Sequence, residues 1–309
     1  MWLSILRPFL TLLGSIIRVL HTAQTVRLTM EQHTNRQTTI PDAARQIHRA
    51  EAILIGAGAG MGVDSGLPDF RGDEGFWRAY PPLKRLGLSF INMANPVWLE
   101  TDPELAWGFY GHRLQLYRET IPHEGFRILK RWMAGAGEGF IFTSNVDGQF
   151  QKAGFPEDNI VECHGSLHYL QCSKGCTRAI RSAADIRISV DTETFHADEP
   201  LPRCPDCGAL ARPNVLMFND WGWHSQRTDD QESRFRRWLS RIGGKRLVII
   251  ECGAGRAVPT VRVTCEALAK NAGAGLIRIN PREPEGPPGT LSIASGALEA
   301  LTAIDGAMG

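Results

Sequence analysis

Four short apolar runs recur along the chain, and each ends at glycine or polar residues. They are AILIG at 52–56, GFIFT at 139–143, RLVIIE at 246–251 and GLIRIN at 275–280. Continuous apolar runs of this length are typical of strands that are buried on both faces of a parallel sheet. The residues after each run would then lie along the carboxyl edge of that sheet, where such sheets bind ligands.

Helix-like segments separate these runs. Residues 96–120 carry apolar side chains such as Trp98 and Leu116 at helical spacing, 124–134 forms a second segment, and 296–304 forms a last short helix. Strands that alternate with helices predict an α/β fold. We therefore expect a Rossmann-like parallel sheet with helices on both faces.

Residues 168–219 interrupt this alternation. They hold four cysteines and the polar stretch SVDTETFHADEP at 189–200. We expect a small inserted module at 166–219, while 41–165 and 220–309 together form the sheet domain.

The N-terminal segment fits none of these elements. Residues 2–20 are apolar and lack acidic residues, but Arg7 and Arg18 interrupt the run, so a stable membrane insertion is not expected. Three interpretations of this segment remain open: a transit peptide, an interfacial helix, or a stretch that precedes a true start at Met30. We treat 1–40 as an extension that is either disordered or precedes the true start.

Composition narrows the class of protein. The 309 residues are 43% hydrophobic and 22% charged, as in globular proteins. With 34 basic and 33 acidic residues the net charge is +1, so no direct nucleic-acid contact is expected. Seven cysteines, an odd number with four of them in pairs, favour a metal site in a reducing compartment over a disulfide framework. We expect a cytoplasmic protein.

Four of the cysteines have the spacing of a metal site. They form one C-x3-C pair and one C-x2-C pair: Cys172, Cys176, Cys204 and Cys207. Four thiolates suit tetrahedral Zn²⁺ and leave no open position, so the metal would be structural. The nearby His168 and His196 are interpreted as ordinary surface or module residues.

The first run leads into a glycine-rich loop. Residues 56–62 read G-A-G-A-G-M-G, so the third glycine of the dinucleotide fingerprint G-x-G-x-x-G would fall at Met61. This spacing disfavours a standard hydride-transfer cofactor site. A loop that approaches a phosphate and a purely structural turn both remain open.

Three further strings carry polar groups. They are DSGLPDFRG at 64–72, TSNVDG at 143–148 and ECHGS at 162–166. A lone histidine is more often structural than catalytic. His164, however, lies at a strand end beside a glycine and some twenty residues after Asn145 and Asp147, which favours a catalytic role.

Together these strings resemble the sirtuin family of NAD-dependent protein lysine deacylases. The resemblance spans roughly residues 45–305. It implies a large Rossmann-like domain, a small inserted zinc-ribbon module, and NAD with an acyl-lysine peptide in the cleft between them. It also implies that His164 is the general base for a ribose hydroxyl, and that Asn145 and Asp147 line the nicotinamide pocket.

The resemblance implies further cofactor contacts. Residues that contact phosphates, shield the ribose or hold the adenosine would be Gly56, Ala57, Gly58, Asp69, Phe70, Arg71, Gly253, Ala254 and Asn280. An aromatic lid such as Phe70 would exclude water from the reacting centre.

Substrate residues follow from two other matches. Val215 and Phe218 lie in a segment, 212–218, that resembles the one that pairs with the substrate peptide as an added strand. Tyr110 and Arg113 are three residues apart on one helical face and resemble the pair that binds a succinyl or malonyl carboxylate. Alternatively, Tyr110 packs in the core and Arg113 is solvated.

The function expected from these features is an NAD-dependent protein lysine deacylase, a deacetylase or desuccinylase that releases nicotinamide and O-acyl-ADP-ribose. Its partner would be an acylated-lysine protein. Departures from the family pattern at Ser144 and at Asn219 and Asp220 leave an NAD glycohydrolase or a protein ADP-ribosyltransferase open. A non-catalytic NAD-binding or zinc-module interaction protein is a third reading, and a nucleic-acid module is a fourth.

Overall fold

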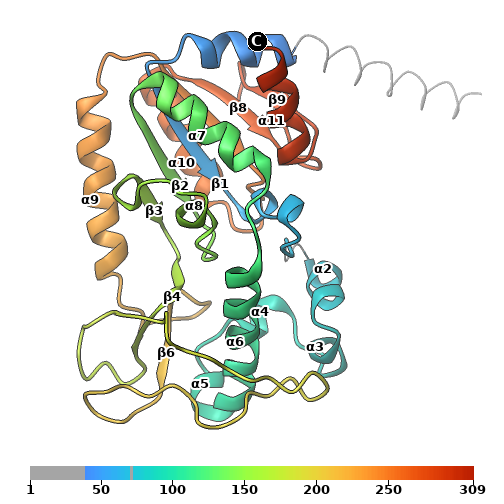
Figure 1. The fold of residues 1–309 in the computed structure, drawn as a ribbon, viewed down its shortest axis with the longest axis vertical. Coiled ribbons are helices and arrows are strands. Elements are labelled where there is room, and N and C mark those ends of the chain that lie inside the picture. Colours follow the sequence, from blue (N-terminus) through green and yellow to red (C-terminus); the bar gives the residue numbers. More distant parts are fainter. Residues whose placement is uncertain (1–38, 70–71) are drawn as a thin grey trace, which may run out of the picture.

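The computed structural model describes residues 39–69 and 72–309. Its upper part in Figure 1 is a parallel sheet between layers of helices, and its lower part combines short helices with a second sheet. The extension predicted at 1–40 and the predicted cofactor residues Phe70 and Arg71 lie outside the described residues, except for positions 39 and 40.

The larger sheet has six strands in the order β3-β2-β1-β7-β8-β9, and every neighbouring pair is parallel. The strands are β1 (Ala52–Ala57), β2 (Gly139–Thr143), β3 (Ile160–Glu162), β7 (Leu247–Cys252), β8 (Gly275–Ile279) and β9 (Leu291–Ile293). The four predicted runs are the four central strands, so the expected parallel sheet is confirmed.

Helices cover both faces of this sheet, as predicted. Along β1, Ile53 and Ile55 face a core shared with the helix at 39–48, α7 (Glu124–Ala136) and α11 (Ala297–Gly306). The alternate residues of β1 face a second core shared with α9 (Gln226–Arg241) and α10 (Thr260–Ala272). This alternation follows from the two-residue period of a strand.

The prediction of one continuous helix at 96–120 was wrong. It consists of α5 (Trp98–Thr101) and α6 (Pro103–Glu119), separated at Asp102. The Asp102 side chain accepts a hydrogen bond from the Leu105 backbone N–H at 3.0 Å, and Pro103 takes the first helical position, where no N–H is needed. An aspartate cap followed by proline therefore starts a new helix.

The lower part of the molecule has its own core. The second sheet, in the order β5-β4-β6, is antiparallel and comprises β5 (Arg181–Ser182), β4 (Gly165–Cys172) and β6 (Ala211–Val215). Its apolar residues pack with those of α2 (Gly72–Ala79), α3 (Pro81–Arg85), α4 (Phe90–Met93), α5 and α6. The remaining helical turns are η1 (Ala59–Met61), η2 (Val63–Ser65), α8 (Gln149–Lys152) and η3 (Glu157–Asn159).

Among the described residues, every helix is too short or too polar to span a lipid bilayer.

Candidate active site

A cavity of about 730 Å³ opens where the carboxyl edge of the six-stranded sheet meets the lower part of the molecule. Many of the residues that line it were predicted from the sequence. The predicted catalytic residues His164, Asn145 and Asp147 all line it. The parallel topology explains this convergence, because β1, β2, β3 and β7 all end at this edge.

The glycine loop after β1 and the loop after β7 interlock on one side of the cavity. Gly58 donates its N–H to the Cys252 carbonyl at 3.0 Å, and a Cβ on Gly58 would lie 2.6 Å from the Cα of Ala254. Gly253 has φ +65°, and a Cβ there would lie 2.4 Å from the carbonyl carbon of Gly60. Both glycines are therefore needed for the close approach of the two loops, and both line the cavity.

The other predicted phosphate-loop residues lie behind this wall. Gly56 and Ala57 are inside β1, and a Cβ on Gly56 would lie 2.4 Å from Sγ of Cys265. Gly56 thus permits α10 to pack against the sheet. Ala254 is buried and accepts a hydrogen bond from Asn280 Nδ2 at 2.8 Å, and neither of these two lines the cavity.

Asn280 shapes the adjoining loop instead. Its side-chain oxygen accepts hydrogen bonds from the backbone N–H groups of Arg282 and Glu283, each at 3.0 Å. Arg282 and Glu283 then line the cavity. Asp69 lines it as well.

Asn145 is fixed to the glycine loop. Its amide Nδ2 donates to the Gly58 carbonyl at 3.0 Å, and its backbone N–H donates to Thr143 Oγ1. Thr143 in turn donates to the Ala57 carbonyl. The loops after β1 and β2 are thereby held in one arrangement.

Asp147 is buried, and its environment changes its acidity. Burial raises the pKa of Asp147 to about 6. The negative charge of Glu162 adds to this rise, whereas the hydrogen bond that Asp147 accepts from the Gln149 backbone N–H opposes it. His168 contacts the Asp147 carbonyl at 2.9 Å through Nε2. His168 lies in β4, within the expected module, and this contact joins β4 to the loop that carries Asp147.

His164 follows β3 and faces the cavity. Burial lowers the pKa of His164 from its ordinary value near 6.5, and a hydrogen bond with the Ser144 backbone opposes that shift. The imidazole is therefore mostly neutral at pH 7, the form that accepts a proton. Its Nε2 lies 3.4 Å from Thr260 Oγ1, a neighbour that the sequence motifs did not indicate.

The opposite wall holds the predicted substrate residues. Val215 and Phe218 line the cavity on either side of Leu216, whose backbone N–H donates to the His164 carbonyl at 3.0 Å. Tyr110 and Arg113 also line it from α6, and both are buried. The alternative of a solvated Arg113 was therefore wrong.

A residue that the motifs missed completes this wall. Tyr117 lies one helical turn after Arg113 and accepts hydrogen bonds from Arg113 Nε at 3.1 Å and Nη2 at 2.7 Å. The sequence contains a pattern that could have identified Tyr117: an aromatic residue, an arginine and a second aromatic residue at positions i, i+3 and i+7, which share one face of a helix.

The four predicted cysteines converge. The Sγ atoms of Cys172, Cys176, Cys204 and Cys207 all lie within 4.8 Å of one another. Those of Cys172 and Cys207 are 3.7 Å apart, and those of Cys176 and Cys204 are 3.6 Å apart. Tetrahedral Zn²⁺ with bonds of about 2.3 Å requires S···S separations of about 3.8 Å. The donor set and its spacing thus fit a structural zinc ion.

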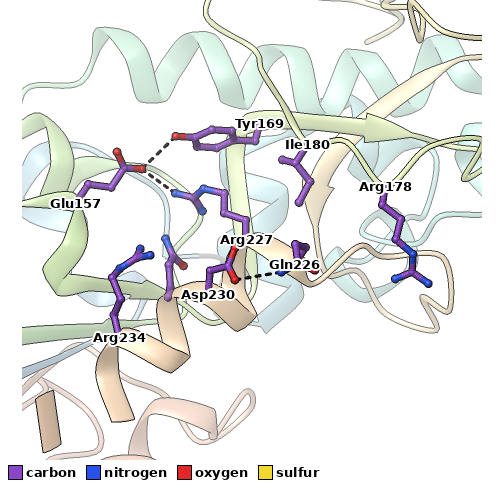
Figure 2. Close-up of a pocket in the computed structure, with 9 residues that line it drawn as sticks. Glu157, Tyr169, Arg178, Ile180, Gln226, Arg227, Asp230 and Arg234 are labelled. Carbon is purple, nitrogen blue, oxygen red and sulfur yellow. Dashed lines mark hydrogen bonds and ion pairs between the residues drawn. The ribbon is translucent and has the colours of Figure 1, made fainter. Parts of the chain in front are cut away.

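A second cavity, of about 340 Å³, lies between α9 and β4 (Figure 2). Its charged groups do not converge: Figure 2 places Arg178 and Arg234 at opposite ends of the view, and Glu157 already pairs with Arg227. Arg227 lies over the ring of Tyr169 at 4.1 Å. This mixture of charges does not form a binding site for one kind of ion.

The residues beneath this second cavity instead support the active site. Arg227 forms an ion pair with the buried Glu162, the last residue of β3. Thr228 donates to the Glu162 carbonyl at 3.1 Å, and Gln231 accepts from the Glu162 N–H at 3.0 Å. Because Glu162 is two residues before His164, α9 fixes the strand end that carries the imidazole.

Comparisons with known proteins agree with this geometry. A family model described as the Sir2 family matches residues 58–228. The NAD-dependent protein deacylase 1 of Archaeoglobus fulgidus is 30% identical over 242 residues, which cover 77% of this chain and 85% of that protein. The NAD-dependent protein deacylase of Thermus thermophilus is 29% identical over 274 residues, which cover 86% and 93%.

Solved structures give the same result. The crystal structure of a Sir2 homologue in complex with NAD is 26% identical and has a TM-score of 0.62, with 85% of this chain and 92% of that chain covered. Together with the parallel sheet and the cysteine cluster, these similarities establish that the chain belongs to the Sir2 family.

Proposed function

We propose that this chain is an NAD-dependent protein lysine deacylase that acts on acylated-lysine proteins and releases nicotinamide and O-acyl-ADP-ribose. The observation that carries the proposal is that His164, Asn145 and Asp147 line one cavity together with the interlocked loops at Gly58 and Gly253. The relatives named NAD-dependent protein deacylase support the same activity.

The residues present fit NAD. The backbones of Gly58 and Gly253 leave no room for a Cβ, so the loop surface that they form is made of main-chain atoms, which is what close approach to a phosphate requires. We infer that the loops at Gly58, Gly253 and Asn280 hold the phosphates and the adenosine ribose. When bound, NAD supplies the ribose carbon that the acyl oxygen attacks as nicotinamide leaves.

The protein's own groups act at the reacting centre. His164, neutral at pH 7, accepts a proton from a ribose hydroxyl at its imidazole. Asn145 and Asp147 line the nicotinamide pocket, and Asn145 is already oriented by its bond to the Gly58 carbonyl. Asp69, Phe70 and Arg71 would cover the ribose and exclude water.

We infer that the acyl chain enters between α6 and the segment after β6. Val215 and Phe218 would flank the acyl-lysine, and Tyr110 and Arg113 would lie at the end of the acyl chain. A buried guanidinium beside a phenol suits an acyl group that ends in a carboxylate, such as succinyl, in addition to acetyl.

We further propose that 41–165 and 220–309 form the NAD-binding domain and that 166–219 form the zinc module, on which α2 to α6 pack. A cluster of four cysteines that can hold a metal ion, in place of a disulfide framework, supports a reducing cytoplasmic location.

The competing function is an NAD glycohydrolase or a protein ADP-ribosyltransferase on the same scaffold. The observation that favours it is Ser144, a short side chain at the cavity wall next to Asn145. The test is to mix the protein with NAD and with matched acetyl-, succinyl- and unmodified lysine peptides. A deacylase releases nicotinamide only with an acylated peptide, whereas release that ignores the acyl group would favour the competing function.

A further inference from the structure

One face of α6 presents a buried polar group to the cavity. Tyr110, Arg113 and Tyr117 lie at positions i, i+3 and i+7, and all three line the cavity and are buried. Among the described residues, the Tyr110 hydroxyl has no hydrogen-bond partner. This face of α6 therefore combines the positive charge of Arg113 with a hydroxyl of Tyr110 that is able to donate a hydrogen bond.

The guanidinium of Arg113 is held between two aromatic rings. Its central carbon lies 5.0 Å from the ring centre of Phe109 and 5.4 Å from that of Tyr117. Both rings attract the cation through their faces. Arg113 is thus held in position by contacts that do not need the Tyr117 hydroxyl.

That hydroxyl occupies one edge of the guanidinium. Nε and Nη2 of Arg113 both donate to the oxygen of Tyr117, at 3.1 Å and 2.7 Å. A carboxylate binds arginine best through two parallel N–H···O bonds, and the Nε and Nη2 pair is one of the edges that can provide them. An incoming carboxylate must therefore displace Tyr117 from this edge or bind elsewhere on Arg113.

The same contact benefits an uncharged acyl group. A buried cation without an acceptor is costly, and an acetyl group offers no anion to compensate it. Tyr117 supplies that acceptor from within the protein when an uncharged acyl group is bound.

We propose that Tyr117 is a positioning residue for acyl-group selection: by occupying the Nε and Nη2 edge of Arg113, it favours uncharged acyl groups over acyl groups that end in a carboxylate. This inference rests on the proposed deacylase function. It assigns to the Tyr117 hydroxyl an effect on which acyl groups the pocket accepts.

The test is the substitution Tyr117→Phe, which keeps the ring over Arg113 and removes only the hydroxyl. Acetyl- and succinyl-lysine peptides of one sequence are compared by kcat/KM and by equilibrium dissociation constants. We expect the succinyl-to-acetyl ratio of kcat/KM to rise roughly tenfold and the succinyl-to-acetyl ratio of the dissociation constants to fall roughly tenfold, because the freed edge can bind the carboxylate. Unchanged ratios, or changes in the opposite directions, would overturn the inference.

A double-mutant cycle tests whether Tyr117 acts through Arg113. In the Arg113→Met background, Tyr117→Phe is expected to leave both ratios unchanged, and a shift of either ratio in favour of the succinyl peptide in that background would also overturn the inference. If the wild-type protein turned over neither peptide, the proposed function would fail. The ratio of the two peptide dissociation constants would still decide the role of Tyr117.

Discussion

At the scale of single residues, the cavity holds groups whose acidity differs from that in water. Burial lowers the pKa of His164 and raises the pKa of Asp147 to about 6. The two shifts leave His164 able to accept a proton near neutral pH, while Asp147 becomes charged only as the pH rises through about 6.

This arrangement predicts the acidic limb of the pH profile. Activity requires neutral His164, so kcat/KM should fall as the pH drops through a pKa below 6.5. The pH profile of the Asp147→Asn variant shows which of the two groups causes this fall. If protonation of His164 causes it, the fall persists in that variant. A limb centred above pH 7, or one that vanishes in Asp147→Asn, would contradict the assignment.

Asp147 also affects stability. Its pKa in the folded protein is raised from 3.8 to about 6, so the stabilising contribution of the protonated form is complete below pH 4 and is lost as the pH rises through 6. The upper bound is about 3 kcal/mol. Urea unfolding should show wild type losing stability over this range relative to Asp147→Asn, and parallel curves for the two proteins would refute this.

Sequence motifs identified many single residues but not their partners. The family strings led to His164, Asn145 and Asp147, all of which line the cavity. Thr260 and Tyr117 were missed because no motif includes them. Each was identified only by its contact with a predicted residue, Thr260 with His164 and Tyr117 with Arg113. Phe70 and Arg71 stay predictions, since they lie outside the described residues.

At the scale of elements, the two interlocked loops after β1 and β7 are the most constrained feature. Gly253 has a left-handed backbone, and its missing side chain faces the backbone of Gly60. This contact joins the two loops that line the phosphate side of the cavity.

Substituting Gly253→Ala should therefore lower the free energy of unfolding by about 2–4 kcal/mol, through backbone strain and steric conflict. Gly135→Ala in α7 is the matched control, because a Cβ there meets no atom within 4 Å. That control should be neutral or stabilise by up to about 1 kcal/mol. Equal effects of the two substitutions in urea unfolding would show that the loop contact is unimportant.

The strands were easier to predict than the helices. The four central strands are fully or almost fully buried, so their sequences are continuous apolar runs. The edge strands β3 and β9 have only three residues each, too few for a pattern. α9 was missed because it is largely polar, with Phe235 and Trp238 as its buried apolar residues.

At the scale of the whole molecule, the cavity is made by two parts with separate cores. The six-stranded sheet contributes the glycine loops and His164, and the lower part contributes α6 and the segment after β6. The cysteine cluster lies at the far end of β4, where it ties Cys172 at the end of that strand to the loop that carries Cys204 and Cys207.

Zinc should therefore be present at about one ion per chain. Cys204→Ser is expected to lose the metal and to lower the melting temperature, because metal binding and folding are coupled. Cys163→Ser, which lies outside the cluster, should retain the zinc. Elemental analysis that found a folded, metal-free wild-type protein would contradict the zinc assignment.

The most direct test of the central claim is the stoichiometry of the reaction. Wild-type protein and the His164→Ala variant are incubated with NAD and an acetyl-lysine peptide, and all products are quantified by mass spectrometry. We predict that wild type forms nicotinamide, deacetylated peptide and O-acetyl-ADP-ribose in equal amounts, and that His164→Ala forms them at least 100-fold more slowly, as expected for loss of a general base. Nicotinamide formed by wild type without deacetylated peptide would contradict the account.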